Sequence, residues 1–367
     1  MIFLISSEFP PGPGGIGQHA YSLSMALSNQ HQVVVLTNQD YATNEEIALF
    51  LAQLPHNIQV IRFAKRYGKL TSFRRTWQTL RLVKQLNPEV IFTSGRFALW
   101  LGAIIKKVMS KRTVYGFAHG IEVHPNSGIL GVITRKACGI LNGIMAVSEF
   151  TASLLQKQSL QKIEILPNGL DETFIKQSRM MASTINPFNW HGHPKLLTVG
   201  NVTPRKGQHR VIKALPEILK HFPNAHYHVV GLPTNADRLL ELAKTLGVYH
   251  AVTFHGKLSS RQDLYRAYLS ADIFIMLSEN QANGDVEGFG IAILEANAFG
   301  VPSIGAIGCG IEDAISSGSG ILVDGNNAIS IVAAIQKILT EKENYARNAR
   351  LWAEKHNWAE LIKKVWM

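Results

Sequence analysis

Short apolar runs alternate with longer amphipathic segments through the first half of the chain. Residues 21–27 carry apolar side chains at helical spacing, whereas the runs on either side are short and continuously apolar, as in buried strands. The predicted strands are residues 2–5, 33–36, 58–63, 90–92, 114–117 and 144–147. Strands that alternate with helices pair in parallel, so this pattern predicts an α/β domain wound on both faces of its sheet.

A polar stretch at residues 176–194, rich in serine, proline, glycine and histidine, interrupts the alternation and is predicted to be a linker. The alternation then resumes, with predicted strands at residues 196–199, 227–230, 252–254, 273–276, 303–304 and 321–323. A chain of 367 residues is long enough for two domains, each with its own core. The pattern therefore predicts two doubly wound domains, at about residues 1–180 and 190–350, whose carboxyl strand ends face a common cleft.

Two glutamates, Glu287 and Glu295, flank a glycine-rich turn at the predicted start of a buried helix. The apolar residues from Ile291 onward predict the helix, and Gly288 and Gly290 leave its N-terminal N–H groups open to a ligand. Such a helix end favours phosphate and sugar oxygens, and both carboxylates can accept hydrogen bonds from ligand hydroxyls. A structural interpretation stays open, with Glu287 as a helix cap and Glu295 as a solvated residue.

The segment from Glu287 to Glu295 resembles the E-x7-E signature of the retaining glycosyltransferases of family 4. That family has the GT-B fold, in which two Rossmann-like domains face each other across a cleft. The resemblance implies that Glu287 contacts the sugar of a nucleotide-diphosphate donor and Glu295 its ribose. It also implies that a C-terminal helix, at about residues 350–367, returns to the first domain. The donor-binding residues then include those of the turn itself, Gly288, Phe289, Gly290 and Ile291.

After the first predicted strand, Gly12, Gly14 and Gly17 formally match G-x-G-x-x-G, a dinucleotide-binding fingerprint. The second strand ends without the acidic residue that binds a ribose, so the match alone is weak evidence for NAD. The same loop resembles the GG-x-G opening of family 4, which implies that Gly15 and Gly17 lie at the donor diphosphate and the acceptor. A turn that needs glycine only for its backbone angles is the alternative.

His119 ends a predicted strand of the first domain, where a lone histidine is often structural. The run from His119 to Glu122 resembles the H-G-x-E segment of family 4, and this resemblance implies that His119 orients the donor sugar beside its anomeric carbon.

Lys206-Gly207 follows the first strand of the second domain, where a cation can neutralise a leaving nucleoside diphosphate. It resembles the phosphate-binding Lys-Gly of family 4. The family usually carries an arginine at the position of Asn201, so one expected charge is missing. Either Arg205 compensates for it or the diphosphate is held with less help, and a merely solvated Arg205 is a further alternative.

The stretch of residues 62–84 holds eight basic residues and no acidic one, with aromatic residues between them. A solvated basic face over core aromatics is one interpretation. The other is contact with an anionic membrane surface, where each basic residue contributes on the order of 1 kcal/mol. No nucleic-acid-binding motif accompanies the stretch. The membrane hypothesis is assigned to Arg74, Arg75 and Arg81.

Charge and cysteine content indicate the cellular compartment in which the protein works. Of the net charge of +11, most lies in residues 1–170, which carry 17 Lys and Arg against 8 Asp and Glu. The two cysteines, Cys138 and Cys309, match no metal or redox spacing, which favours a reducing compartment. No apolar run is long enough to span a membrane, and the N-terminus is typical of a strand and not of a signal peptide. We therefore expect a cytoplasmic protein, peripheral on the inner face of the membrane if the basic stretch binds there.

The family-like segments occur in order over nearly the whole chain. They imply a retaining glycosyltransferase that needs no metal or other cofactor and uses a UDP- or GDP-sugar. The expected acceptor is lipid-linked or carbohydrate, in polysaccharide or lipid-linked glycan biosynthesis, and no nucleic acid is expected. Three alternatives stay open: a glycoside hydrolase that uses the two carboxylates, a nicotinamide oxidoreductase, and a non-catalytic protein that binds a sugar nucleotide. The hydrolase leaves Lys206-Gly207 unexplained.

Overall fold

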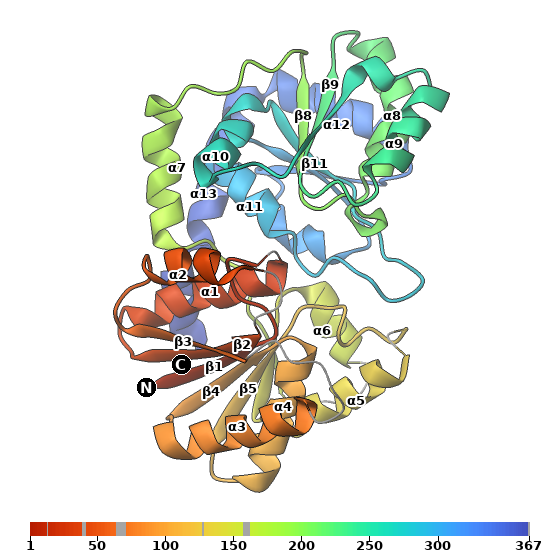
Figure 1. Ribbon diagram of the computed structural model, residues 1–367. Coiled ribbons are helices and arrows are strands. Elements are labelled where there is room, and N and C mark those ends of the chain that lie inside the picture. The colour runs from red at the N-terminus through yellow and green to blue at the C-terminus, as the bar shows by residue number, and fades with distance from the viewer. Residues whose placement is uncertain (13, 39–41, 64–70, 127, 157–161, 366–367) are drawn as a thin grey trace. The chain divides into compact units, whose positions relative to one another are not determined.

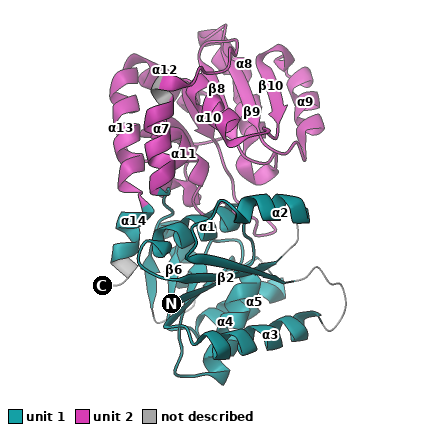
Figure 2. Cartoon of the chain, turned by 60° about the vertical axis from the view of Figure 1, so that its left-hand side comes forward, with its two compact units in different colours: residues 1–171, 358–367 teal, residues 172–357 magenta. Residues whose placement is uncertain are grey.

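The computed structural model describes residues 1–12, 14–38, 42–63, 71–126, 128–156 and 162–365. The chain divides into two compact units, one of residues 1–171 and 358–367 and the other of residues 172–357 (Figures 1 and 2). Each unit is a parallel sheet with helices on both faces. The predicted fold class of two Rossmann-like, doubly wound domains is confirmed.

The sheet of the first unit has the strand order β3-β2-β1-β4-β5-β6-β7, with every pair parallel. Its strands are β1 (Ile2–Ser6), β2 (Val33–Asn38), β3 (Ile58–Phe63), β4 (Val90–Ser94), β5 (Thr113–Ala118), β6 (Gly143–Ala146) and β7 (Ile163–Ile165). Its helices are α1 (Gly15–Ser28), α2 (Asn44–Leu51), α3 (Thr71–Leu86), α4 (Arg96–Val108), α5 (Gly128–Cys138), α6 (Glu149–Gln156), α14 (Trp358–Leu361) and the 3-10 helix η4 (Ile362–Val365).

Both faces of this sheet are apolar. Its central strands are continuously apolar, and successive side chains of a strand point to opposite faces. Ile2 and Leu4 of β1 lie in one core with residues of α1, whereas Phe3 and Ile5 lie in another with residues of α3 and α4. The fully buried Trp358 of α14 belongs to the α1 core. The end of the chain therefore completes the first unit.

The second unit repeats the plan, with the strand order β10-β9-β8-β11-β12-β13 and parallel pairing throughout. Its strands are β8 (Lys195–Val199), β9 (His226–Val230), β10 (Val252–Gly256), β11 (Ile273–Met276), β12 (Ser303–Ala306) and β13 (Gly320–Val323). Its helices are α7 (Glu172–Thr184), α8 (Gln208–His221), α9 (Ala236–Thr245), α10 (Arg261–Ser270), α11 (Ile291–Ala298), α12 (Ala328–Thr340) and α13 (Lys342–Lys355), with the 3-10 helices η1 (Pro204–Lys206), η2 (Tyr249–Ala251) and η3 (Gly310–Ala314).

The predicted linker at residues 176–194 is wrong in its first half, which belongs to α7. The buried positions Phe174, Ile175 and Ser178 have helical spacing, but Ser178 is polar, so the apolar pattern was too short to predict a helix. Phe174 packs edge-on against the ring of Tyr265, with the ring centres 5.4 Å apart. This packing attaches α7 to the second unit.

The rest of that stretch packs on strands β9 and β10. The ring of Trp190 stacks on the rings of His228 and His255, each 4.4 Å away between centres. Burial lowers the pKa of His228 to about 3 and that of His226 to about 4, with neighbouring histidines adding to the shift. These histidines are therefore neutral packing residues at neutral pH.

Candidate active site

The strand order of the second unit reverses between β8 and β11, and the loops that follow these two strands meet at the carboxyl edge of the sheet. In doubly wound sheets a ligand binds at such a switch point. The loop after β8 runs into the turn η1, and the loop after β11 leads to the start of α11. Together they carry most of the residues predicted to bind the donor.

Two glycines allow close backbone contact with the loop after β11. Gly207 has a φ of 73°, and a Cβ there would lie 1.9 Å from the carbonyl oxygen of Leu277, at the end of β11. Gly310 belongs to the segment after β12, and a Cβ there would lie 2.3 Å from the carbonyl oxygen of Gly288, on the loop after β11. Any larger side chain would force the loops apart, so glycine is required at both places.

The structure brings Glu287 together with Lys206 and Arg205. Lys206 Nζ lies 2.8 Å from Glu287 Oε2, and the Arg205 guanidinium also pairs with that carboxylate. Arg205 Nε lies 3.0 Å from Asp285 Oδ1, so it bridges two acids of one loop. Arg205 is therefore an ordered part of the site and not a solvated surface residue.

The carboxylate of Glu287 is ionised although it is buried. Burial raises its pKa, but the charges of Lys206 and Arg205 and a hydrogen bond from the Gly290 amide outweigh burial, and the net pKa is lowered. The result is a cluster in which two cations face one buried carboxylate. Such a cluster can exchange its internal ion pairs for contacts with a ligand that carries both phosphates and hydroxyls.

Glu295 lies on α11, about one turn beyond the helix start, and accepts a hydrogen bond of 2.6 Å from the Tyr268 hydroxyl. Burial and the nearby Glu295 charge raise the pKa of Tyr268 well above its usual value, so the phenol stays a donor. The half-buried Glu295 is therefore not the purely solvated residue of the structural interpretation.

The remaining donor-binding candidates of this unit differ in whether their backbone or their side chain is accessible to a ligand. The ring of Phe289 is buried in the unit, so only its backbone is available to a ligand. Gly290 has a φ of 83° and precedes α11 directly, with Ile291 as the first helical residue. Asn201 is exposed, and its carbonyl accepts a hydrogen bond of 3.1 Å from the Gln208 side chain. The amide of Asn201 supplies no positive charge where the family has an arginine.

In the first unit, His119 lies at the end of β5, next to the end of β4. Its Nε2 is 2.8 Å from the Ser94 hydroxyl, and its backbone N–H donates to Glu122 Oε1 at 2.7 Å. Burial lowers the pKa of His119 to about 4. A neutral imidazole fits a residue that orients a sugar through hydrogen bonds.

The glycine-rich loop closes around the carboxylate of Glu8. A Cβ on Gly14 would lie 1.9 Å from Glu8 Oε2, and one on Gly17 would lie 3.3 Å from the Phe9 nitrogen. Burial raises the pKa of Glu8. A hydrogen bond from the Gly17 amide lowers it, but burial has the larger effect. Gly15 is exposed as the first residue of α1, where the helix has no side-chain cap. Gly15 thus leaves a helix N-terminus accessible to an anion.

Sequence reasoning missed a group of unpartnered polar atoms in this unit. Within the described ranges, Glu8 Oε2, Glu122 Oε2 and both ring nitrogens of His19 are buried without a hydrogen-bond partner. The ring centre of His19 lies 4.7 Å from that of His119. Buried polar groups are costly when unpaired, which indicates a polar ligand. The sequence signals were the H-G-x-E segment for Glu122 and, for Glu8 and His19, only their positions after β1 and on α1.

Helix α3 presents exposed aromatic and basic residues. Phe73 and Trp77, one turn apart, are 71 % and 55 % exposed, and the Arg81 guanidinium lies 5.6 Å from the centre of the Trp77 ring. Arg75 covers the ring of Phe63 at 5.4 Å, while Arg74 is exposed. The aromatics of α3 are therefore not the core residues of the first interpretation. Lys65, Arg66 and Lys69 of the basic stretch lie outside the described residues.

In the part of the chain that the structure describes, no group of three or more His, Cys, Asp or Glu residues is arranged to hold a metal ion. A search of the same residues for a helix of the length and hydrophobicity that a bilayer span needs found none.

Comparison with known families accounts for both units. Residues 13–174 match the family described as Glycosyltransferase Family 4, and residues 184–354 match Glycosyl transferases group 1. A mannosyltransferase of Corynebacterium glutamicum, named as GDP-mannose-dependent and acting on a monoacylated phosphatidylinositol monomannoside, is 33 % identical over 92 % of this chain and 88 % of that protein. The chain belongs to glycosyltransferase family 4. This glycosyltransferase is therefore an enzyme of the hexosyltransferase class. The family assignment excludes the oxidoreductase and hydrolase alternatives.

Other relatives and solved structures agree with this assignment. A Mycolicibacterium smegmatis mannosyltransferase, named as acting on phosphatidylinositol monomannoside, is 25 % identical over 98 % of the glycosyltransferase and 93 % of that protein. The Anabaena protein HepE, solved with UDP and glucose, superposes with a TM-score of 0.74 at 19 % identity over 99 % of this chain and 97 % of its own. Sucrose-phosphate synthase from Thermosynechococcus elongatus superposes with a TM-score of 0.76 at 18 % identity over 99 % and 96 %. These structures show the shared GT-B fold.

Proposed function

We propose that the enzyme is a retaining glycosyltransferase that transfers a hexose from a UDP- or GDP-sugar to an acceptor hydroxyl without a metal ion. The observation that carries the proposal is the cluster of Glu287 with Lys206 and Arg205 at the start of α11. A bound donor would replace the internal pairs: the diphosphate would take the two cations, and a sugar hydroxyl would take the carboxylate. Two side-chain cations and the helix N-terminus can balance a leaving diphosphate, so the site does not call for a metal.

The residues of the cluster have separate tasks in this mechanism. No protein nucleophile is proposed: the acceptor hydroxyl attacks the face of the sugar that the diphosphate leaves, and its proton passes to a phosphate oxygen. Lys206 and the backbone N–H groups of the α11 start stabilise the leaving charge, and Glu287 fixes the sugar. His119, neutral at its pKa of about 4, orients the sugar as a hydrogen-bonding partner. Glu295 binds the ribose.

The proposal predicts that a nucleoside diphosphate stabilises the enzyme in the absence of metal. At about 100 times its dissociation constant, a ligand adds roughly 2.7 kcal/mol to the free energy of unfolding, which raises the melting temperature measurably. The measurement is a thermal-shift screen with UDP, GDP, ADP and their sugar conjugates, each with magnesium and with EDTA. Stabilisation by one base in EDTA supports the proposal and names the donor. Stabilisation only with magnesium contradicts metal independence, and none at all contradicts the donor site.

We further propose a lipid-linked acceptor and a membrane-facing surface on the first unit. Both mannosyltransferase relatives are named for phosphatidylinositol-based acceptors. Helices α3, α4 and α5 follow one another over one face of the sheet (Figure 1). Besides Phe73 and Trp77 of α3, these helices expose Val108 of α4 to 64 % and Ile129 of α5 to 77 %. Exposed apolar side chains among basic ones are typical of a surface that enters the headgroup region of an anionic bilayer.

Changing Arg74, Arg75 and Arg81 together to glutamate is expected to abolish binding to anionic vesicles. Each basic residue near such a surface contributes on the order of 1 kcal/mol, so the combined loss exceeds 100-fold in partition. The measurement is co-sedimentation with phosphatidylglycerol-containing vesicles, with neutral phosphatidylcholine vesicles alongside. A charge-matched control changes Lys257, Lys337 and Lys355, exposed lysines of the second unit, to glutamate. Equal binding by both triple variants would contradict the membrane assignment.

A further inference from the structure

The second unit contains a cavity of about 380 Å³ that has no part in the mechanism above. It lies between α8 and α9 and is closed by the loops that follow β8 and β11. This volume is typical of small-molecule sites. The cavity therefore has room for a ligand of the size of a phosphorylated monosaccharide.

Basic side chains from two helices line this cavity, and those of Lys213 and Arg238 are exposed. Lys213 on α8 and Arg238 on α9 line it together with His209. Neither Lys213 nor Arg238 forms an ion pair with any residue that the structure describes. Burial lowers the pKa of His209, the charges of Lys213, Arg210 and Arg238 lower it further, and Glu279 opposes them. Lys213 and Arg238 therefore both act on the same side chain of the cavity lining.

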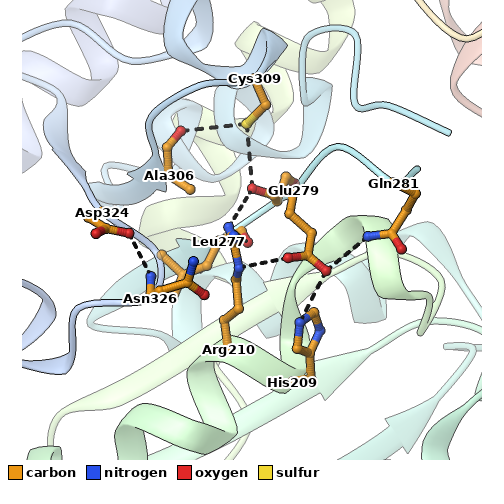
Figure 3. Close-up of polar contacts among 10 residues, drawn as sticks. His209, Arg210, Leu277, Glu279, Gln281, Ala306, Cys309, Asp324 and Asn326 are labelled. Carbon is orange, nitrogen blue, oxygen red and sulfur yellow. Dashed lines mark hydrogen bonds and ion pairs between the residues drawn. The ribbon is translucent and has the colours of Figure 1, made fainter. Parts of the chain in front are cut away.

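The acidic residue of the cavity is already neutralised. Glu279 pairs with Arg210 Nε at 3.1 Å and with His209 Nε2 at 3.2 Å, and it accepts a hydrogen bond of 2.9 Å from the Gln281 side chain (Figure 3). Arg210 also donates to the carbonyl oxygen of Leu277. This network leaves the charges of Lys213 and Arg238 uncompensated, which favours a phosphate over a cation or a neutral ligand.

The floor of the cavity is apolar. Val202, Leu239 and Leu242 line it and are buried or half-buried. Asn235, at the start of α9, adds an amide that can bind hydroxyls. An apolar floor with a few polar groups fits the C–H face and hydroxyls of a sugar better than inorganic phosphate alone.

Both segments that close the cavity also build the donor cluster. Thr203 and Pro204 line the cavity, and the next two residues of η1, Arg205 and Lys206, pair with Glu287. Glu279 and Gln281 line it at one end of the loop whose other end carries Asp285 and Glu287. The Glu279 amide N–H donates to the Arg205 carbonyl at 3.0 Å, which ties the two segments together. A ligand that orders these segments changes the cost of ordering the donor cluster.

We propose that this cavity binds a sugar monophosphate through Lys213 and Arg238, and that its occupancy changes the affinity of the enzyme for its nucleotide donor. The second part rests on the function proposed above, whereas binding to the cavity does not. The site is separate from the donor cluster, because Lys213 and Arg238 lie on the helices α8 and α9 and take no part in the ion pairs of Glu287.

The test is isothermal titration of the full chain with glucose 6-phosphate, mannose 6-phosphate and inorganic phosphate. Wild type is expected to bind a sugar phosphate at least tenfold more tightly than inorganic phosphate. Lys213→Gln and Arg238→Gln should each weaken that binding about tenfold or more, as loss of a charged hydrogen bond does. Lys220→Gln on α8 and Lys244→Gln on α9 are matched controls outside the cavity and should bind as wild type does. Lys206→Ala should also retain binding, since it alters only the donor cluster.

A second titration measures coupling. The nucleoside diphosphate identified by thermal shift is titrated with and without saturating sugar phosphate, and the reverse titration must give the same factor, expected to be fivefold or more. Failure of every sugar phosphate to bind, or loss of binding in Lys206→Ala but not in Arg238→Gln, overturns the site. Binding without a change in donor affinity overturns the coupling. A protein that nucleoside diphosphates stabilise but sugar phosphates do not refutes this inference and leaves the proposed function intact.

Discussion

Glu287→Gln is expected to lower the rate of sugar transfer by about 100-fold or more while the protein stays folded. Glutamine keeps the size of the side chain but removes the charge that faces Lys206 at 2.8 Å and the Arg205 guanidinium. Loss of one preorganised charged group from a buried site has effects of this size on transition-state stabilisation. The measurement is the initial rate of transfer from the donor identified by thermal shift, expressed as kcat/KM, with a melting curve for each protein.

The matched control for this change is Asp285→Asn. Asp285 lies on the same loop and pairs with the same arginine, but its side chain is 34 % exposed against 11 % for Glu287. Its charge is better screened by solvent, so we expect a loss of less than about tenfold. Near-normal turnover of Glu287→Gln, or an equal loss in both variants, would mean that Glu287 only anchors the loop and does not hold the sugar.

The periodicity of the sequence predicted most of the fold because parallel strands buried on both faces are continuously apolar. Residues 33–36, for example, were predicted as a strand and form β2. The short strand β7 (Ile163–Ile165) was missed, since it lies at the sheet edge and two of its three residues are exposed. Helix α7 was missed for a related reason: its buried positions include the polar Ser178, so a count of apolar residues finds only Phe174 and Ile175 there.

Within the candidate site, the sequence could name residues but not their partners. Glu287 and Lys206 stand 81 positions apart, and only the crossing of the loops after β8 and β11 brings them to 2.8 Å. Glu8 and His19 carried no motif that distinguished them from structural residues, and Glu122 was known only as the last residue of the H-G-x-E segment. The buried, unpartnered atoms of all three became visible only in the fold. The cavity between α8 and α9 is likewise built from three separate segments. Spacing along a chain gives contacts within an element, whereas such sites depend on contacts between elements.

Gly207→Ala is expected to destabilise the second unit by at least about 3 kcal/mol and to remove activity with it. An alanine in the left-handed region costs roughly 1–2 kcal/mol by itself. Its Cβ would also lie 1.9 Å from the carbonyl oxygen of Leu277, and a backbone atom cannot yield as a flexible side chain does. Strain at a special φ combined with a steric clash is among the few mechanisms that give such large effects.

Gly247→Ala separates the two contributions to this loss. Gly247 has nearly the same φ, 71°, but a Cβ there would meet nothing within 4 Å, so only the backbone strain of about 1–2 kcal/mol remains. Apparent unfolding free energies of both variants come from urea titrations monitored by tryptophan fluorescence and circular dichroism. Equal destabilisation of the two would show that the loops after β8 and β11 can separate at little cost. A much larger loss in Gly207→Ala would show that their close crossing positions Lys206 beside Glu287, because Gly207 is the residue that follows Lys206 and caps η1.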